Sequence, residues 1–300
     1  MQKRKLKAQE KNNLSVEENK FLERIEKTID ATIKKYKLFS KNEKIVVAAS
    51  GGKDSTVLLY VLKKLGYKIE ALTINAFIGN YSKESLDNLV KFCKNQKIKL
   101  HIVSLRDEFG YSLCYIKSIL ASKGTNLKSC TICGVLRRYL LNKHARKLKT
   151  DKLALGHNLD DEAQVVMMNF IRGDIPVSAR LGPVTGVIKN KKFVPRVKPL
   201  YMIREKDIAR YSKLRGFPVK YGECPCSMDS LRRSMKGIFG DFEKEDPAVR
   251  EKIIKAFLKV LPRMKKLYKR EEDIEYCETC GEPTQKKMCK TCQILKNLKS

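Results

Sequence analysis

The segment from Ser50 to Ser55, SGGKDS, has the residue types of a phosphate-binding loop. Its glycines let the backbone approach phosphate oxygens, and its serine hydroxyls and those of Thr56 can donate to them. Lys53 adds a positive charge, and the Asp54 carboxylate can hold Mg²⁺ or a water molecule. The pattern differs from Gly-x-x-x-x-Gly-Lys-Ser/Thr, which favours chemistry at a γ-phosphate. An ordinary glycine turn that caps a helix is the structural alternative.

A second polar segment, residues 156–162 with the sequence GHNLDDE, follows a short apolar run and opens a helix. Asn158 and Asp161 have the spacing of a capping pair, and the helix dipole favours acidic side chains in the first turn. Capping alone would explain these residues. Three carboxylates at the end of a strand are also what Mg²⁺ coordination or proton transfer would use, so the segment is predicted to be functional.

Cys130 and Cys133 form a Cys-x-x-Cys pair, and Cys224-Pro-Cys226 is a distant candidate partner. A lone pair is ambiguous among zinc, redox and iron–sulfur sites, whereas a third thiolate permits an iron–sulfur cluster with one open iron. An open iron can bind sulfide. A structural zinc site or a redox disulfide remains the alternative, and Cys226 is expected to be a spare ligand or a sulfur relay. Two further cysteines, Cys93 and Cys114, are predicted to be buried structural thiols.

A second group of cysteines lies near the end of the sequence, at Cys277, Cys280, Cys289 and Cys292. Two Cys-x-x-Cys pairs at this separation are typical of a structural zinc site. The surrounding lysines would suit contact with an RNA backbone, although a purely structural zinc site would need no other function.

The elements that must position these groups alternate between strands and helices. Strands are expected at 45–49, 69–76, 100–105 and 152–155, and helices at 56–65, 83–95, 135–148 and 159–170. This alternation predicts an α/β fold with a doubly wound parallel sheet, whose ligands bind at the carboxyl ends of the strands. Further helices are expected at 21–38, 204–214 and 248–269. Three parts are predicted: a basic N-terminal arm (1–20), a nucleotide-binding domain (21–270) and a zinc-binding module (271–300).

The net charge of the 300-residue chain is +31, from 64 Lys and Arg against 33 Asp and Glu. Such an excess favours a polyanionic partner, nucleic acid above all, over an anionic membrane surface or a merely solvated basic surface. No apolar stretch is long enough for a membrane span and no secretory signal is evident, so a cytoplasmic protein is expected. In a reducing compartment, clustered cysteines are metal ligands or catalytic thiols before they are disulfides.

The loop SGGKDS resembles the pyrophosphatase loop of the PP-loop ATPases, which cleave ATP between its α- and β-phosphates and adenylate a carbonyl oxygen. The segment GHNLDDE resembles a motif of PP-loop tRNA-modifying enzymes. The three cysteines, with the runs 133–138 and 196–200, resemble the 2-thiouridine synthetases of the TtuA/NcsA type in the TtcA/TtuA family. The resemblance covers approximately residues 21–292. It also leads one to expect an N-terminal zinc knuckle, whereas the first cysteine here is Cys93.

This resemblance implies an adenine nucleotide α-hydrolase-like fold, with ATP, Mg²⁺, a [4Fe-4S] cluster and zinc as cofactors. It implies cluster ligands at Cys130, Cys133 and Cys224. The expected nucleotide-binding residues are Ala49, Ser50, Gly51, Gly52, Lys53, Asp54, Ser55, Thr56, Ile74, Asn75, Gly156 and Asp161. The expected catalytic residues are Lys53, Cys130, Cys133, Arg137 and Asp161.

The implied reaction is 2-thiolation of a tRNA uridine. The uridine C2 oxygen would attack the α-phosphate, Asp161 would orient the base or a metal ion, and Arg137 and Arg138 would stabilise phosphate or the RNA backbone. Sulfur would then replace AMP at C2. A ubiquitin-like sulfur-carrier protein and a homodimer are further implications. The rival hypotheses are a cytidine-thiolating or lysidine-forming PP-loop enzyme and a non-catalytic zinc RNA-binding protein.

Overall fold

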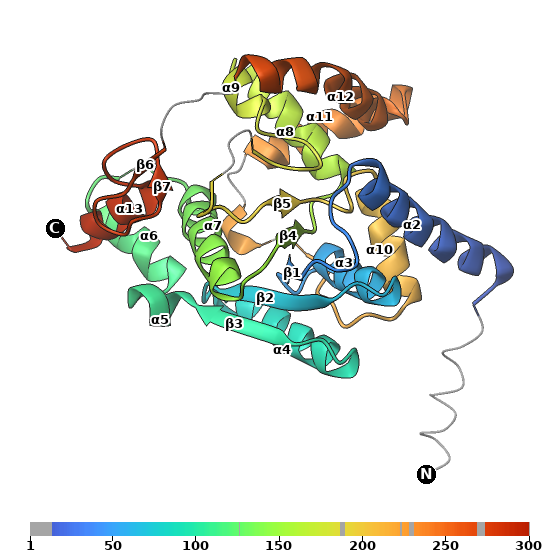
Figure 1. The fold of residues 1–300 in the computed structure, drawn as a ribbon, viewed down its shortest axis with the longest axis horizontal. Coiled ribbons are helices and arrows are strands. Elements are labelled where there is room, and N and C mark those ends of the chain that lie inside the picture. The colour runs from blue at the N-terminus through green and yellow to red at the C-terminus, as the bar shows by residue number, and fades with distance from the viewer. Residues whose placement is uncertain are drawn as a thin grey trace, which may run out of the picture.

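A five-stranded parallel sheet forms the centre of the computed structural model (Figure 1). The structure describes residues 14–125, 127–186, 190–222, 224–227, 231–268 and 274–299. The strands are β1 (Ile45–Ala48), β2 (Ile69–Asn75), β3 (Leu100–Ser104), β4 (Lys152–Leu155) and β5 (Arg196–Val197), in the order β3-β2-β1-β4-β5. The doubly wound α/β fold is therefore confirmed. The short β5 was not predicted, because two residues between a proline and a lysine form no apolar run.

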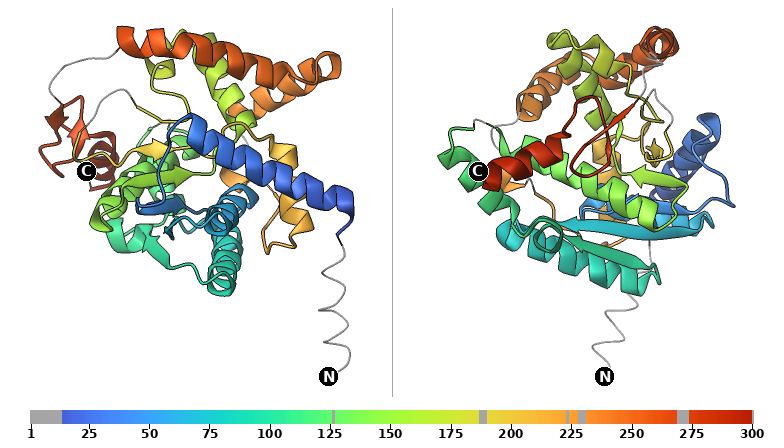
Figure 2. Two further views of the ribbon diagram at one scale, coloured as in Figure 1. Left: turned by 45° about the vertical axis from the view of Figure 1, so that its right-hand side comes forward. Right: turned by 60° about the vertical axis from the view of Figure 1, so that its left-hand side comes forward.

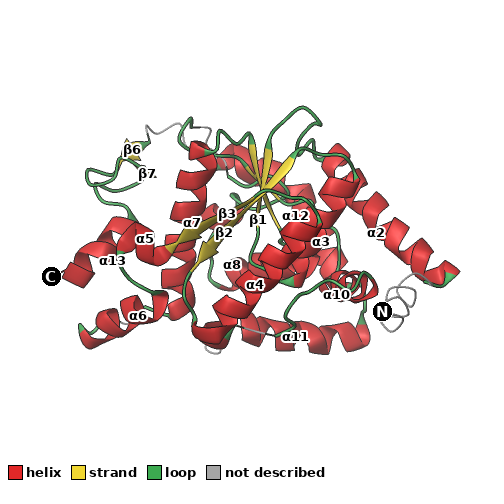
Figure 3. Ribbon diagram, turned by 90° about the horizontal axis from the view of Figure 1, so that it is seen from below, coloured by secondary structure: helices red, strands yellow, loops and turns green. Residues whose placement is uncertain are grey.

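Successive residues of the central strand β1 contribute to different apolar cores, as strand geometry requires. Ile45 and Val47 belong to one core, and Val46 belongs to the other. The first core includes residues of four helices: α2 (Val16–Lys35), α3 (Lys53–Lys64), α4 (Gly79–Asn95) and α10 (Glu205–Leu214). The second includes residues of α5 (Leu105–Phe109), α6 (Leu113–Ser122) and α7 (Ser129–Lys147). Figure 3 shows helices around the central sheet.

A third apolar cluster joins α8 (Leu159–Ile171) to α11 (Leu231–Glu245) and α12 (Val249–Leu267), which lie together at one side of the molecule (Figures 1 and 2). Buried side chains of this cluster include Val166, Phe239 and Phe257. The short helix α9 (Ile175–Ser178) follows α8. The segment Pro225–Ser227 is a single 3-10 turn.

Several helices begin earlier than the sequence predicts, and two of these differences are large. Helix α2 begins at Val16, inside the predicted arm, because Ser15 and Glu18 form a capping box. The first thirteen residues of that arm lie outside the described residues. Helix α7 begins at Ser129, so Cys130 and Cys133 lie in its first turns and not before it. Helices α5, α6 and α11 were not predicted.

The C-terminal unit consists of the hairpin β6 (Glu275–Tyr276) and β7 (Pro283–Thr284) followed by α13 (Lys290–Lys299). It lies beside α6 and α7 (Figure 1). Ile294 and Leu298 of α13 are buried in the same core as residues of α7. Arg146 of α7 donates to the Glu282 carboxylate at 2.8 Å, which fixes the unit at its other end. Within the described ranges, no helix is both long and apolar enough to cross a membrane.

Candidate active site and cysteine centres

The loop between β1 and α3 requires glycine at position 51. Its φ of +79° lies in the left-handed region, and a Cβ atom there would lie 2.2 Å from the carbonyl oxygen of Ser85 in α4. No other residue could bring the loop this close to α4. Gly52 is the N-cap of α3 and offers no side chain to the first N–H groups of the helix. These donors therefore face the loop, as a phosphate site at a helix N-terminus requires.

The serines of this loop bond mainly to the loop itself. Ser55 Oγ accepts from the Ser50 N–H at 3.2 Å and donates to the Gly52 carbonyl at 3.1 Å. The Gly52 N–H lies 3.4 Å from Ser50 Oγ. Thr56 is buried, and the Ala49 N–H donates to the Leu72 carbonyl at 2.9 Å. The loop is thus shaped before any ligand binds.

Lys53 lies between two carboxylates. Its amino group is 3.1 Å from Asp54 Oδ2 and 2.9 Å from Oε1 of Glu205, the first residue of α10. Burial disfavours the charged amine, but the two carboxylates outweigh burial and raise the pKa of Lys53. Burial also raises the pKa of Asp54, against the opposing effect of Lys53. Glu205 was not among the expected site residues.

The segment after β4 packs directly on the phosphate loop. A Cβ atom on Gly156 would lie 3.1 Å from the Ser55 nitrogen, a tight contact that glycine avoids. Asn158 donates to Asp54 Oδ1 at 2.9 Å. Asn158 and Asp161 also form the predicted capping box at the start of α8. The two motifs recognised in the sequence therefore form one site at the carboxyl ends of β1 and β4.

The three acidic residues of this segment have different partners. Asp160 accepts from Arg250 at 2.6 Å, and Glu162 accepts from Lys198 at 2.7 Å, both in buried pairs. These two carboxylates are therefore bound to cations of the protein itself. Asp161 is less buried and lies 3.4 Å from Arg232 of α11.

At the end of β2, the expected adenine-side residues Ile74 and Asn75 contact helix α7 and the chain that follows β2. Arg137 of α7 donates to the Ile74 carbonyl at 3.0 Å, and Asn75 Oδ1 accepts from the Phe77 N–H at 3.1 Å. Arg137 was expected beside phosphate or RNA, whereas here its guanidinium joins α7 to β2.

The structure brings the two distant cysteine segments together. The Cys130 thiol donates to the carbonyl oxygen of Cys226 at 3.4 Å. Cys133 and Cys224 are partly buried against the same apolar core. Burial raises the pKa of Cys133, and the charges of Cys224 and Cys130 raise it further, which places the three thiols in one electrostatic neighbourhood. An iron–sulfur cluster attaches each thiolate to a different iron, so thiols that hold one need not converge on a single point.

Two of the remaining cysteines were interpreted together but differ in structure. Cys93 is buried as predicted, and burial raises its pKa to about 11. Cys114 is exposed near the start of α6, so its prediction as a buried thiol was wrong. Its Sγ lies 3.8 Å from the Phe77 carbonyl, and its charge contributes to the raised pKa of Cys226.

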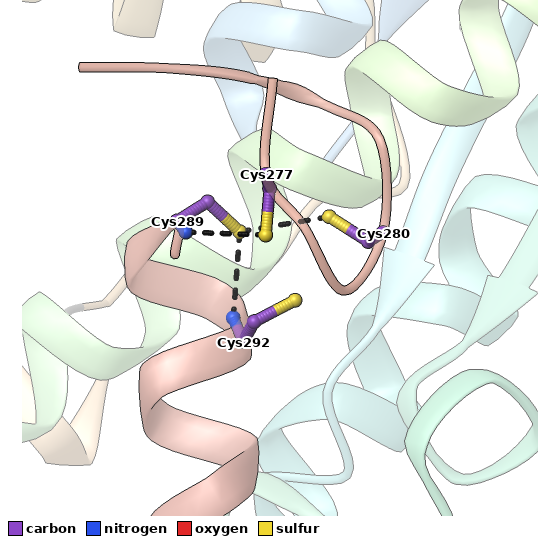
Figure 4. A group of neighbouring side chains, drawn as sticks. All are labelled: Cys277, Cys280, Cys289 and Cys292. Carbon is purple, nitrogen blue, oxygen red and sulfur yellow. Dashed lines mark hydrogen bonds between the residues drawn. The ribbon is translucent and has the colours of Figure 1, made fainter. Parts of the chain in front are cut away.

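The four C-terminal thiols converge on one point, as Figure 4 shows. The sulfur atoms of Cys277, Cys280, Cys289 and Cys292 all lie within 4.8 Å of one another. Backbone N–H groups point at two of the sulfurs, at 3.3 Å for Cys277 and 3.4 Å for Cys289. Four convergent thiols with N–H donors have the ligand set of a structural zinc site.

Comparisons with known proteins agree with this geometry. A family model described as PP-loop domain matches residues 21–223. The tRNA-5-methyluridine(54) 2-sulfurtransferase of Pyrococcus horikoshii is 36% identical over 280 residues, which cover 92% of this chain and 86% of that protein. This chain belongs to the PP-loop tRNA 2-thiolation family.

Other members of the tRNA 2-thiolation family are similar over comparable lengths. The tRNA 2-thiolation protein NcsA of Haloferax volcanii is 32% identical, with 85% of this chain and 82% of that protein covered. The U34-tRNA thiolase NcsA from Methanococcus maripaludis, solved with its [4Fe-4S] cluster, superposes with a TM-score of 0.79 at 31% identity. That comparison covers 94% of this chain and 89% of the thiolase. The family resemblance read from the sequence is confirmed.

The sequence did not reveal the partners of the family motifs. Glu205, Arg232 and Arg250 reach the site from segments that carry no motif of their own. Lys198 lies in the run 196–200, which resembles the family, yet nothing in that run indicates an ion pair with Glu162. Pairing between distant segments depends on the tertiary fold, and a single sequence contains no local signal for it.

Proposed function

We propose that this chain is an ATP-dependent tRNA uridine 2-sulfurtransferase that forms 2-thiouridine. One observation carries the proposal. The Arg137 guanidinium bonds the Ile74 carbonyl, so the helix that begins with Cys130 and Cys133 is attached to the same sheet edge as the phosphate loop. This attachment supports a single reaction centre for the thiols and the nucleotide loop.

The phosphate loop and the segment after β4 would hold ATP. Lys53 and the N–H groups at the start of α3 would bind phosphate oxygens, and the backbone near Ile74 would face the adenine. Asp54 and Asp161 are only partly buried and would be the carboxylates that hold Mg²⁺, whereas Asp160 and Glu162 lie in buried ion pairs. Asn158 keeps Asp54 in place through its 2.9 Å hydrogen bond.

The proposed reaction has two steps, adenylation of the uridine C2 oxygen and its replacement by sulfur. The uridine C2 oxygen attacks the α-phosphorus, the bond to the β-phosphate breaks, pyrophosphate leaves, and the uracil N3 proton is lost. Hydrosulfide then adds at C2, AMP departs with the former C2 oxygen, and the hydrosulfide proton moves to N3, which leaves 2-thiouridine. Cationic groups near the α-phosphate, Lys53 among them, would stabilise the developing negative charge. A [4Fe-4S] cluster on Cys130, Cys133 and Cys224 would supply sulfide at its iron without a protein ligand.

Zinc in the four-thiol site would hold the C-terminal unit against α6 and α7. We further propose tRNA as the polyanionic partner of the +31 chain. A ubiquitin-like sulfur carrier as donor and a homodimer remain predictions from the family resemblance, and a cytoplasmic location remains a prediction from the sequence. Sulfide and thiocarboxylated carrier can be compared as donors, and light scattering measures the oligomeric state.

The decisive test is an anaerobic assay of reconstituted protein with ATP, sulfide and unmodified tRNA. Wild type should release AMP and form 2-thiouridine, read by mass spectrometry at positions 34 and 54, since relatives are named for both. A Cys130→Ala variant should lose thiolation. Cys114→Ala is the matched control, because it removes an exposed thiol that belongs to neither set of expected ligands. Normal thiolation by Cys130→Ala, or no AMP from wild type, would contradict the proposal; 2-thiocytidine would support the rival thiolase.

A further inference from the structure

Two arginine side chains, Arg138 and Arg196, lie beside the candidate site. Arg196 of β5 donates to the backbone carbonyl of Arg138 in α7 at 3.3 Å. The Arg138 guanidinium itself folds against Gly134, where a Cβ atom would lie 3.0 Å from its Nη1. A glycine in the interior of a helix costs about 1 kcal/mol relative to alanine, so this position gives up helix stability while leaving room for the guanidinium.

The charge of these two groups has no carboxylate partner among the ion pairs of the described residues. Other arginines near the site are paired: Arg250 lies 2.6 Å from Asp160, and Arg204 lies 3.1 Å from Glu251. Burial, together with the charge of Arg138, lowers the pKa of Arg196 to about 10. Like charges held together in this way favour an anion between them.

Two more cations surround the same place. Burial, and then the charges of Lys198, Arg232, Arg196 and Arg138, lower the pKa of His157 to about 3, so all four cations act on this one imidazole. The imidazole is therefore neutral at physiological pH. Its Nδ1 atom is buried and has no hydrogen-bond partner among the residues that the structure describes.

The carboxylates beside these cations are already engaged. Glu162 is paired with Lys198 at 2.7 Å, and Asp161 lies 3.4 Å from Arg232. These pairings neutralise two of the four cations near His157. Arg138 and Arg196 are the two that have no carboxylate partner among the described ion pairs. Arg138 is exposed and Arg196 is half-buried, so a ligand can reach this pair from solvent.

The position of the pair indicates which anion it takes. His157 follows Gly156, which touches the phosphate loop at Ser55, and Arg138 acts on the Cys133 thiol. The pair therefore lies between the nucleotide loop and the thiols. The loop has its own phosphate donors in Lys53 and the start of α3, so ATP does not need a second set. An RNA substrate carries a phosphodiester on either side of every base, and a base that reacts must leave its stack.

We propose that Arg138 and Arg196 form a phosphodiester clamp that holds the RNA backbone next to the uridine that enters the site. Planar guanidinium groups suit this role, because each can present two parallel N–H donors to phosphate oxygens. The proposal rests on the proposed tRNA thiolation and assigns two positioning residues to it. Arg232 then remains with Asp161, and Lys198 remains with Glu162.

The test measures tRNA affinity of the full-length chain as a function of salt. In an Arg138→Ala/Arg196→Ala variant, the slope of log K against log salt should fall in magnitude by about 1 to 2, and affinity near 0.15 M salt should fall roughly tenfold or more. ATP affinity without RNA should be unchanged. Arg196→Lys should keep most of the slope but raise the KM for tRNA, since it keeps the charge and loses the planar fork.

Arg263→Ala, an exposed arginine of α12, is the matched control, and thermal melting checks that each variant is folded. The clamp is wrong if the double variant binds tRNA with the wild-type slope, or if ATP affinity falls and the slope does not. An equal fall in the salt-dependence slope of the Arg263→Ala variant would also overturn the clamp, because the effect would then not be specific to Arg138 and Arg196. A wild type that binds tRNA but never thiolates it would instead refute the proposed function.

Discussion

The Lys53 amino group lies 2.9 Å from the Glu205 carboxylate, so the phosphate loop is bonded to the first residue of α10. Asp54 approaches the same amine at 3.1 Å, and Lys236 lies 3.7 Å from the other Glu205 oxygen. Without nucleotide, the lysine thus has two carboxylate partners. ATP must bring its phosphates into this group of charges, where Glu205 repels them.

A Glu205→Gln substitution should therefore strengthen ATP binding at low Mg²⁺. It removes one like charge from the phosphate site while leaving a side chain of the same size, and the gain should be on the order of 1 kcal/mol, or several-fold in Kd. Since Mg²⁺ screens the same repulsion, the gain should shrink when Mg²⁺ is saturating. Calorimetric titration with ATP at both Mg²⁺ levels measures this difference.

Asp207→Asn, on the same helix, serves as the control because its ion pair is with Arg24 at 4.0 Å and not with the loop. Weaker ATP binding by Glu205→Gln would show that the carboxylate positions Lys53 and does not compete with phosphate.

Gly51→Ala should abolish nucleotide binding and lower stability. The alanine would adopt an unfavourable φ of +79°, which costs about 1–2 kcal/mol, and its Cβ would meet the Ser85 carbonyl at 2.2 Å. Gly66→Ala separates the two effects, because Gly66 also has a φ of +79° but has no atom closer than 4.0 Å. Denaturant unfolding should show Gly51→Ala to be worse by a further ~1–3 kcal/mol. Equal losses would mean that the loop can move away from α4.

Lys198→Met should destabilise the protein by about 3–5 kcal/mol, since it leaves the buried Glu162 carboxylate without its partner. Burial already raises the pKa of Glu162 above its ordinary value of 4.5, and losing Lys198 raises it further. The folded state then binds a proton that the unfolded state releases, so the loss of stability should grow as pH rises above 4.5. Urea unfolding across this range measures it. A Glu162→Gln/Lys198→Met double variant should recover most of the loss.

Cys280→Ser should remove zinc and loosen the C-terminal unit. Wild type is expected to bind about one zinc ion per chain, and one missing thiolate breaks the four-ligand set. Elemental analysis gives the zinc content, and limited proteolysis reports whether the unit has detached. Cys114→Ser, which changes an exposed thiol outside this group, should leave zinc content at the wild-type level. Full zinc retention by Cys280→Ser would contradict a four-thiolate site.

The sequence predicted the strands of the sheet most accurately, because β1, β2 and β4 are apolar runs followed by polar segments. The β4 bounds agree with the prediction, and β1 and β2 differ by one residue at their ends. Helix starts were less predictable. Helix α7 begins at Ser129, ahead of the expected start, because the polar residues between Lys128 and Cys133 carry no helical period and no capping side chain marks the start.

The motif residues of the site were also predictable, since glycine and lysine at this spacing indicate phosphate binding and paired cysteines indicate metal binding. Their partners were not. The bond between Lys53 and Glu205 joins residues 152 positions apart, and the contact between Cys130 and Cys226 joins residues 96 apart. Arg137 shows the same limit. An arginine suggests a phosphate-binding role, but nothing in the sequence indicates that its guanidinium donates to the Ile74 carbonyl at the end of β2.

Helix α7 has residues of three sites along its length: Cys130 and Cys133 in its first turns, Arg137 and Arg138 next, and Arg146, which bonds the C-terminal unit, in its last turn. A helix of this length is stiff, so a displacement of one end also moves the other end. Backbone amides along α7 are therefore expected to share one opening event in hydrogen exchange. Loss of zinc from the C-terminal unit would then displace Cys130 and Cys133 through α7, with no change in any residue that touches the nucleotide.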